Sequence, residues 1–528
     1  MTEFDPYDRL IESCRNSSQY PYTLLNETTP RAVLEGYHEH LVQNDGALFD
    51  DSDPRLVFWE AWPGTQRFKK TKVQDVKGLS EHLIRDGVDP NSRHIFIESN
   101  HSRAPLNCSP DMLKTLFTYH QVDPSFLDSL FAFGDQDEPL DAGLAHFRSD
   151  DKLNLRERLP RLPRLGRSGM ELRHSFLLRS VERADAADPW SIRQVAAYHS
   201  FDVENGRSVW ITLKGNNLLQ KRIKDDSLDL PVHQGALGLD VGAAFEASLA
   251  THLTFFHWCE HNWRWYVRDV EERIRTSLAR AKTIPVESEP SYRTGVLASS
   301  RDSTMQLSTF NPVSEKGSIV QRTICGLRWP DRTAFDHAPA VQEPPFSRAR
   351  RVPEGLAVLN MFNYKDLQKL SILAERIEEA TLVVQLNVDA LQDVYEYYQR
   401  PIHDNVRPDV RMHMEKSAAT FLLKLRQIIR SLETRHTQLA SLRKRLDNGK
   451  ALYENLLQLR SLQVSRVFAE HGHKSAINME NIARRTERET VSMHTVTVVT
   501  LLFLPATFLG VSSSLSHSHL SSTRTFRR

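Results

Sequence analysis

The spacing of hydrophobic residues predicts a mixed α and β domain over residues 1 to about 270 of this 528-residue chain. Short apolar runs at 55–60 and 94–98 have the length and composition of buried strands. Two β-rich runs within 195–213 flank Asn205-Gly206, a residue pair that accepts the positive φ angles of a tight hairpin turn. We therefore expect a sheet that contains a hairpin closed at Asn205-Gly206.

Helical patterns alternate with these strands. Proline near the first turn, where its missing N–H costs nothing, marks the start of predicted helices at 110–119 and 124–131. A longer helical pattern covers 242–281. The stretch 145–172 is rich in Arg, Leu and Pro and has no period, so we expect an exposed loop there.

Apolar residues in the last third of the chain recur at alternating steps of three and four, the spacing of a long helix with a narrow apolar seam. One series covers 367–398 and is expected to end before Pro401. A second series covers 421–446, and a bend or break is expected at Asn448-Gly449. The spacing fits a coiled coil between chains and also an intramolecular helical hairpin, because heptads alone do not set the oligomeric state.

The segment 493–511 suits hydrocarbon better than water. No Asp, Glu, Lys or Arg occurs between Glu489 and Arg524. A helix over this segment would span about 28 Å, close to the roughly 30 Å apolar core of a bilayer. We expect a transmembrane helix; a buried C-terminal core helix is the alternative, because four threonines and Pro505 make the segment only moderately apolar.

These patterns predict an α+β N-terminal domain, followed by a long, coiled-coil-like helical stalk that runs into a C-terminal transmembrane helix. The region before the stalk is dominated by Pro, Ser, Thr, Arg and Glu without a period, which is typical of a linker. The expected parts are a mixed α/β cytoplasmic domain (1–282), a flexible linker or insertion (283–353), a helical stalk (354–491), the transmembrane helix (492–511) and a disordered polar tail (512–528).

Charge and cysteine content narrow the location and the class of function. Lys plus Arg (68) nearly equals Asp plus Glu (67), so no global field favours nucleic acid as a partner. Four widely spaced cysteines suit a reducing compartment, and the start MTEFDPYDRL lacks the features of a signal peptide. We therefore expect a cytoplasmic N-terminal domain. Because no phosphate-binding glycine loop, His-Glu-x-x-His or nucleophile elbow occurs, we do not expect an enzyme.

One local group of histidines invites a metal hypothesis. His252, His257, Cys259 and His261 lie close together in the sequence. Their spacings of five, two and two do not share one helix face, so we expect an aromatic packing face around them instead of a zinc site. The sequence assigns no metal ligand, and no bound cofactor is expected.

The segment 493–510 resembles the first membrane helix of the CorA family of magnesium channels, in which a stalk helix enters the membrane and carries a Pro-x-Thr-Phe element. Here that element is Pro505, Thr507 and Phe508. Upstream runs resemble fungal proteins with a CorA-like transporter domain: Trp190-Ser-Ile-Arg-Gln194, Tyr198-His-Ser-Phe-Asp202, Trp210 and Trp258-Cys-Glu-His-Asn-Trp-Arg-Trp-Tyr266. The resemblance implies a cytoplasmic α/β domain, a helical stalk, two membrane helices per subunit, and a homopentamer in the lipid bilayer whose first helices line the pore.

Matching residues to that first membrane helix places six side chains on the pore face, at steps of three and four: Thr490, Met493, Val496, Thr500, Leu504 and Thr507. The apolar members would form constrictions. The hydroxyls would face a hydrated cation, which suits magnesium because it gives up its water reluctantly. Alternatively, each threonine bonds only to the backbone carbonyl one turn earlier.

The resemblance implies a passive oligomeric channel for divalent metal cations, with magnesium as the transported or regulatory ion. Cation bound between cytoplasmic domains would hold the stalks closed, and its loss would let them splay. An acidic cluster could contribute such a site, although a surface loop rich in acids is the commoner explanation: Asp135, Asp137, Glu138 and Asp141.

The sequence departs from the family after Gly510. The family's Gly-Met-Asn signature does not follow, and the serine-rich residues with His517 and His519 have neither the length nor the apolarity of a second span. The alternative function is therefore a non-conducting, membrane-anchored oligomeric scaffold, or a truncated family member that lacks the second membrane helix.

Overall fold

The computed structural model describes residues 5–283 and 362–520, apart from short gaps at 66, 85–86, 101–102, 136–144, 155–157, 185–187, 215–216, 224–230, 235–236, 239 and 403–404. The described residues divide into two units: the first lies within Met1–Lys282 and Phe362–Gln458, and the described part of the second is residue 283 with residues 459–520. Apart from residue 283, the predicted linker at 283–353 lies outside the described residues.

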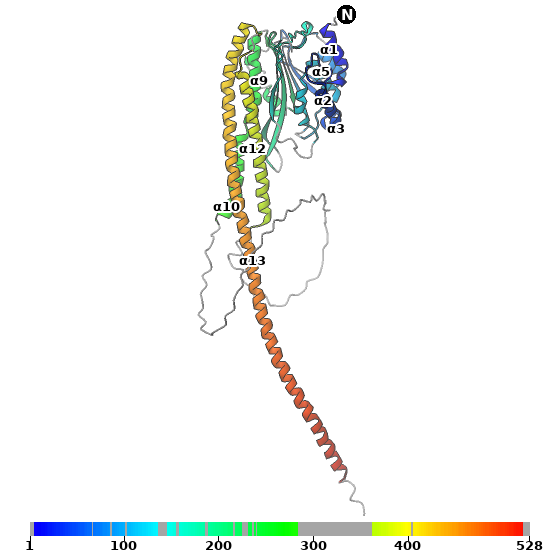
Figure 1. The fold of residues 1–528 in the computed structure, drawn as a ribbon, viewed down its shortest axis with the longest axis vertical. Helices are drawn as coiled ribbons and strands as arrows, with labels where there is room; N and C mark the ends of the chain where they lie inside the picture. Colours follow the sequence, from blue (N-terminus) through cyan, green and yellow to red (C-terminus); the bar gives the residue numbers. More distant parts are fainter. Residues whose placement is uncertain are drawn as a thin grey trace, which may run out of the picture. The chain divides into compact units, whose positions relative to one another are not determined.

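A seven-stranded sheet of order β2-β1-β3-β7-β6-β5-β4 lies at the centre of the first unit (Figure 1). Its strands are β1 (Leu56–Ala61), β2 (Lys69–Val73), β3 (Ser92–Ile97), β4 (His146–Ser149), β5 (Glu171–Arg183), β6 (Trp190–Asp202) and β7 (Ser208–Leu213). Neighbouring strands are antiparallel except β3 and β7, which are parallel. The strands predicted at 55–60 and 94–98 are confirmed as β1 and β3.

The predicted hairpin is also confirmed. Strands β6 and β7 pair antiparallel on either side of Asn205-Gly206, and Gly206 has a φ of +69°. This left-handed conformation is the one that glycine adopts at no steric cost, which is why this residue pair marks the turn in the sequence.

Short N-terminal helices cover one face of the sheet. They are α1 (Pro6–Arg15), η1 (Ser17–Gln19), α2 (Arg31–Gln43), α3 (Asp45–Leu48), α4 (Val76–Ile84), α5 (Pro110–His120), η2 (Pro124–Phe126) and α6 (Leu127–Phe131). Helix α5 confirms the prediction at 110–119; it begins after Ser109, whose hydroxyl accepts a hydrogen bond from the Met112 N–H at 3.2 Å. Its Leu116 and Phe117 are buried in a core that also contains Ile95 of β3. The prediction at 124–131 is confirmed by η2 and α6.

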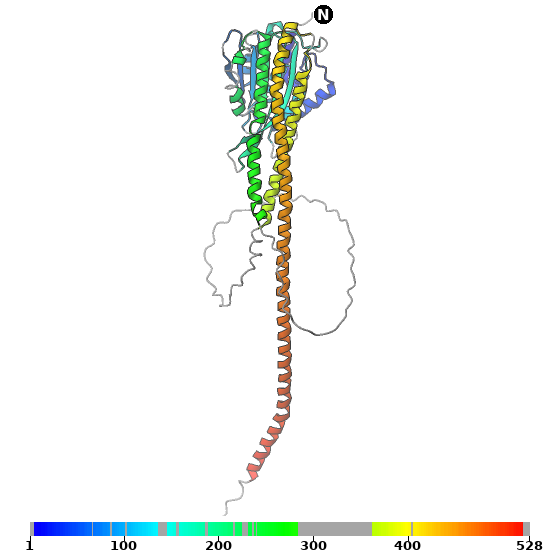
Figure 2. The same ribbon diagram turned by 90° about the vertical axis from the view of Figure 1, so that its left-hand side faces the viewer.

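A layer of long helices covers the other face of the sheet. Figure 2 shows α9 (Val241–Glu260), α12 (Tyr364–Gln399) and the start of α13 (Pro408–Leu520) running side by side. Helix α10 (Trp263–Thr283) continues beyond α9, and the short helices α7 (Asn217–Arg222) and α8 (Pro231–Gln234) come before it in the chain. As predicted, α12 ends before Pro401.

The two heptad series lie in α12 and α13, and most of their residues are buried inside the first unit. Tyr398 of α12 and Phe421 of α13 place their ring centroids 5.0 Å apart. Farther along, the Arg443 guanidinium donates to the Ala374 carbonyl at 3.1 Å. The apolar seam is therefore packed within one chain, as in the intramolecular alternative.

The prediction of an exposed loop at 145–172 is wrong. The described part of this segment contains β4, the turn η3 (Pro163–Leu165) and the start of β5, and it buries Leu162 and Leu165. Its Arg167 donates to Asp89 at 2.6 Å, and Asp89 also pairs with Arg93 at 3.3 Å. Arginines usually remain in water, and no local pattern indicates that a buried carboxylate neutralises this one.

The single helix predicted at 242–281 is in fact two, because α9 ends at Glu260 and α10 begins at Trp263. Asn262, between them, donates its side-chain amide to the Val181 carbonyl of β5 at 2.8 Å. Its own carbonyl accepts hydrogen bonds from the N–H groups of Trp265 and Tyr266. This anchoring to the sheet is a tertiary contact, which the local helical pattern does not reveal.

The break predicted at Asn448-Gly449 is also wrong, since α13 is continuous through both residues. Gly449 instead allows close packing against α10. A Cβ atom at this position would lie 2.3 Å from Cδ1 of Leu278, and Leu278 is buried. The glycine is therefore explained by steric contact between helices and not by a bend.

We expect the substitution Gly449→Ala to destabilise the first unit. The added methyl group overlaps buried Leu278, and overpacking of this kind costs about 1–3 kcal/mol, more than the roughly 1 kcal/mol that alanine gains from helix propensity. The matched control is Gly36→Ala in α2, where nothing lies within 4 Å of the new Cβ. In urea unfolding, the control should match or exceed the wild-type midpoint; an unchanged midpoint for Gly449→Ala would contradict the packing argument.

Candidate functional site

Among the described residues, α13 is the one helix long and apolar enough to cross a membrane. Within it, Met493, Leu501 and Phe508 are 71%, 70% and 76% exposed, and none of the apolar window is buried. The alternative of a buried core helix is therefore wrong. Apolar surface costs about 25 cal/mol per Å² in water, so this part of the helix requires lipid or other apolar partners. Helix α13 continues to Leu520, past the expected start of the tail at 512.

The six residues predicted to face a pore all lie on α13 and are all exposed: Thr490, Met493, Val496, Thr500, Leu504 and Thr507. At about 100° per residue they share one arc of roughly 120° on the helix. The opposite arc carries Val491, Val498, Leu502 and Leu509, with Thr495 as its one hydroxyl. The helix thus has a face rich in hydroxyls and a face that is nearly all aliphatic. Whether the first face lines a pore stays a prediction.

Thr490, Thr500 and Thr507 all bond to the backbone, as does Thr497, which lies on the same arc and donates to the Met493 carbonyl at 2.7 Å. Thr490 donates to the Thr486 carbonyl at 2.7 Å, and Thr500 donates to the Val496 carbonyl at 2.6 Å. Thr507 donates to the Phe503 carbonyl at 2.9 Å. The backbone bonds that the alternative predicts are therefore present. They use only the hydroxyl proton, so each oxygen keeps lone pairs that can accept a hydrogen bond.

The family element around Pro505 lies inside α13 and does not end it. Because proline has no N–H, the Leu501 carbonyl one turn earlier lacks its usual helical donor. Thr507 supplies a nearby donor, since its hydroxyl also lies 3.0 Å from the Leu504 carbonyl. The element therefore combines a weakened turn at Leu501 with a threonine hydroxyl that bonds to the Phe503 and Leu504 carbonyls of the next turn.

The residues weighed as metal ligands do not form a local group. His257 and His261 are exposed, Cys259 is buried, and His252 points toward the sheet. Of the acidic cluster only Asp135 is described; Asp137, Glu138 and Asp141 lie outside the described residues. The side chains of His517 and His519 also lie outside them.

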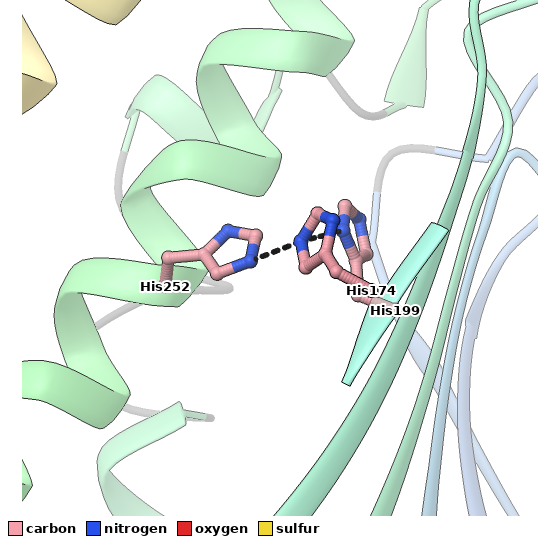
Figure 3. A group of neighbouring side chains, drawn as sticks. All are labelled: His174, His199 and His252. Carbon is pink, nitrogen blue, oxygen red and sulfur yellow. Dashed lines mark hydrogen bonds between the residues drawn. The ribbon is translucent and has the colours of Figure 1, made fainter. Parts of the chain in front are cut away.

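Three buried histidines from distant parts of the chain meet between the sheet and α9: His174 of β5, His199 of β6 and His252 of α9 (Figure 3). The Nε2 atoms of His174 and His252 are 2.7 Å apart. Nδ1 of His199 lies 3.0 Å from Nε2 of His174. One nitrogen from each ring lies within 4.8 Å of the others, which is the arrangement of a candidate metal centre.

The strand register brings two of these histidines together. His174 pairs directly with His199 across β5 and β6, and His199 pairs directly with Trp210 of β7. The His199 and Trp210 rings are stacked with centroids 4.0 Å apart, which fixes the orientation of the imidazole. The sequence did not predict β5 as a strand, and without β5 no local spacing relates His174 to His199.

Helix α9 supplies the third ring in a fixed tautomer. Nδ1 of His252 lies 3.0 Å from the Ser248 carbonyl, which can only accept, so Nδ1 carries the proton. The lone pair of His252 therefore lies on Nε2 and points at His174. A ligating histidine is commonly held by a carbonyl in this way.

Burial keeps all three rings neutral. Desolvation lowers the pKa of His174 and His199 well below its ordinary value, and the neighbouring imidazoles lower both further. Desolvation likewise lowers the pKa of His252 to about 3. At neutral pH the cluster therefore presents neutral imidazoles, which is the form that binds metal ions.

Comparison with known families gives one match. The family described as CorA-like transporters matches residues 12–282, about half of the chain. Among curated proteins, none matches this sequence.

Several solved structures are similar in three dimensions. The cytoplasmic domain of ZntB from Vibrio parahaemolyticus RIMD 2210633 is 10% identical, with a TM-score of 0.31, and the match covers 76% of this chain and 99% of that one. The soluble domain of CorA from Methanocaldococcus jannaschii is 8% identical, with a TM-score of 0.29 and coverages of 73% and 94%. The complete CorA magnesium transporter from the same organism is 8% identical, with a TM-score of 0.30 and coverages of 78% and 80%. TM-scores this low do not support an inference about function.

Acid should destabilise the first unit through its buried histidines. The pKa of His252 is about 3 in the folded chain, whereas an unfolded histidine titrates near 6.5. Between these values the unfolded chain binds a proton that the folded chain does not. The free energy of unfolding should therefore fall as the pH drops from about 6.5 toward 3, with a slope of up to about 1.4 kcal/mol per pH unit from this residue.

Urea unfolding followed by tryptophan fluorescence, with a chelator present, measures this slope. His252→Gln should make the pH dependence shallower by about one proton. Equal slopes for wild type and His252→Gln would contradict the assignment.

Proposed function

Because this chain belongs to the CorA-like family of transporters, we propose that it moves divalent metal cations, magnesium foremost, across a lipid bilayer. The family match confirms the resemblance predicted from the sequence, and a member of a transporter family is not an enzyme. The observation that carries the proposal is α13, a helix that contributes to the first unit up to Gln458 and whose residues after Glu489 form an exposed apolar segment without Asp, Glu, Lys or Arg.

A pathway for ions needs several copies of this segment. One helix encloses no space, and its aliphatic face of Val491, Val498, Leu502 and Leu509 suits lipid. We therefore propose a homo-oligomer, a pentamer as the resemblance implies, in which the arc with Thr490, Thr500 and Thr507 faces inward. Met493, Val496 and Leu504 lie between the threonines along that arc, and their apolar side chains would narrow the ion pathway.

The hydroxyl arrangement suits a hydrated divalent cation. Magnesium keeps its water, and each water of the hydration shell donates hydrogen bonds outward. Thr490, Thr500 and Thr507 have used their protons on backbone carbonyls and so offer lone pairs that accept from these waters. A ring of such acceptors would guide the ion without removing its shell.

We place the N-terminal domain on the cytoplasmic side of the membrane. Cys108 and Cys259 are buried free thiols in the first unit, and Cys14 is a partly buried one. Free cysteines are typical of a reducing compartment.

The first test compares two threonines on opposite faces of α13. Thr500→Val removes a proposed pathway hydroxyl at nearly constant volume, and we expect magnesium influx to fall roughly five-fold, which corresponds to about 1 kcal/mol for one lost acceptor. Thr495→Val is the matched control, because Thr495 makes the same type of bond, to the Val491 carbonyl at 2.8 Å, on the aliphatic face. Influx is measured with a magnesium dye in proteoliposomes that contain the full chain.

Two outcomes would contradict the proposal. If the wild-type chain gives no influx, the non-conducting scaffold becomes the better description of this chain. If Thr495→Val lowers influx as much as Thr500→Val, the assignment of the pathway face is wrong.

The second test addresses assembly. Cysteines introduced at Leu504, on the pathway face, should form disulfide-linked dimers between chains under mild oxidation in lipid vesicles. Leu502→Cys, about 200° away around the helix, should not. Non-reducing gel electrophoresis measures both, and equal cross-linking at the two positions would argue against the proposed face.

A further inference from the structure

The three histidines make two nitrogen–nitrogen contacts, but only one N–H proton is available for both. Since His252 Nε2 is an acceptor, His174 Nε2 must carry the proton that joins them at 2.7 Å. The same nitrogen lies 3.0 Å from His199 Nδ1, which must then share that single proton. Two further ring nitrogens, His174 Nδ1 and His199 Nε2, are buried without a hydrogen-bond partner among the described residues.

Such a cluster is costly as a purely structural feature. An unpaired buried polar atom costs about 1–3 kcal/mol, and three imidazoles also give up their hydration on burial. Phenylalanine or leucine at these positions would fill the space without that cost. A metal ion bound to His174 Nε2, His199 Nδ1 and His252 Nε2 would use three nitrogen lone pairs at once, with the His174 proton moved from Nε2 to Nδ1.

We propose that His174, His199 and His252 bind a divalent transition-metal ion of the zinc class, and that this ion ties α9 to strands β5 and β6. The site lies in the first unit, apart from the apolar segment, and does not depend on the proposed transport function.

The geometry fits such an ion after small side-chain rotations. Zinc binds histidine nitrogen at about 2.0–2.1 Å, so the ligand nitrogens of a tetrahedral site lie about 3.3 Å apart. The separations of 2.7 and 3.0 Å need to open by a few tenths of an ångström, and the third separation, up to 4.8 Å between His199 and His252, needs to close. The Tyr398 hydroxyl of α12 lies 3.5 Å from His174 Nε2 and borders the fourth position.

The ligand chemistry selects the metal. Neutral imidazoles suit zinc, copper, nickel and cobalt, whereas magnesium and calcium prefer oxygen ligands. The Asp151 carboxylate lies beyond the ring next to the site, since it accepts a hydrogen bond from the Tyr397 hydroxyl at 2.9 Å and the Tyr397 and His174 ring centroids are 5.5 Å apart.

The surrounding contacts indicate what the ion would stabilise. His252 packs against Phe421 of α13, with ring centroids 6.2 Å apart, and against Trp210 of β7 at 4.6 Å. An ion bound here would join the sheet to α9 directly, close to Tyr398 of α12 and Phe421 of α13. Its binding energy would therefore add to the stability of the helical layer on the sheet.

The test uses the full chain in detergent after removal of metals with a chelator. Titration with Co²⁺ should give the visible absorption of a tetrahedral site, saturating at one ion per chain. Zn²⁺ should displace the Co²⁺, and Mg²⁺ in large excess should not. Zn²⁺ should also raise the unfolding temperature.

Two variants separate this site from any other. His252→Gln removes one proposed ligand and should weaken Co²⁺ binding at least 100-fold. His94→Gln is the matched control, because His94 is equally buried on the same face, stacked on Trp210 with centroids 6.1 Å apart, and is not one of the three. The control should bind like wild type.

The proposal is overturned if the wild-type chain shows neither the cobalt spectrum nor a zinc-dependent rise in unfolding temperature, or if His252→Gln binds as tightly as wild type. If His252→Gln fails to fold, X-ray absorption spectroscopy of the zinc-loaded wild-type chain identifies the ligands of the ion instead. Three imidazole ligands are expected, and a shell that contains sulfur or fewer than three imidazoles would refute the site.

Discussion

The antiparallel pairing of β5 with β6 is the constraint on which the rest of the first unit depends. It runs from Glu171 opposite Asp202 to Arg183 opposite Trp190. Because side chains alternate across a strand, this register sends His174 and His199 toward α9 and sends Leu177 and Tyr198 into the core under the N-terminal helices. A slip of one residue would exchange the two sets. The helical layer, the buried core and the histidine cluster all require this one register.

Sequence patterns predicted the features that depend on near neighbours. The turn at Asn205-Gly206 and the ends of α5 and α12 follow from a few adjacent residues, and the apolar segment follows from an uninterrupted run without charge. The predictions that were wrong share another cause: in each case a residue contacts a part of the chain that is distant in the sequence. Asn262 divides a helix by bonding to β5, Gly449 makes room for Leu278, and Arg167 is neutralised by Asp89. The pore-face residues came from family resemblance, whereas the histidine cluster joins three segments and has no local signature.

The heptad residues of α12 and α13 are packed inside one chain, and this limits how copies of the chain can associate. Ile377, Val384 and Leu391 of α12, and Leu425, Leu432 and Leu439 of α13, are all buried within a single chain. A seam that is already packed is not available to a second copy. After Gln458 the helix has further apolar residues that are exposed, among them Leu462, Phe468 and Met479. Heptad spacing was a correct sign of helix packing here, but the packing is internal.

The backbone bonds of the threonines have a consequence for preorganisation. A hydroxyl that donates to the carbonyl four residues earlier, as those of Thr490 and Thr500 do, is held in one rotamer by the helix itself. Fixing a free side chain when a ligand arrives costs about 0.5–1.5 kcal/mol, and that cost has already been met in the folded helix. The outward lone pairs keep their direction whether or not an ion is near. A passing cation with its water would meet a rigid surface, and its transit would not have to wait for side chains to rotate.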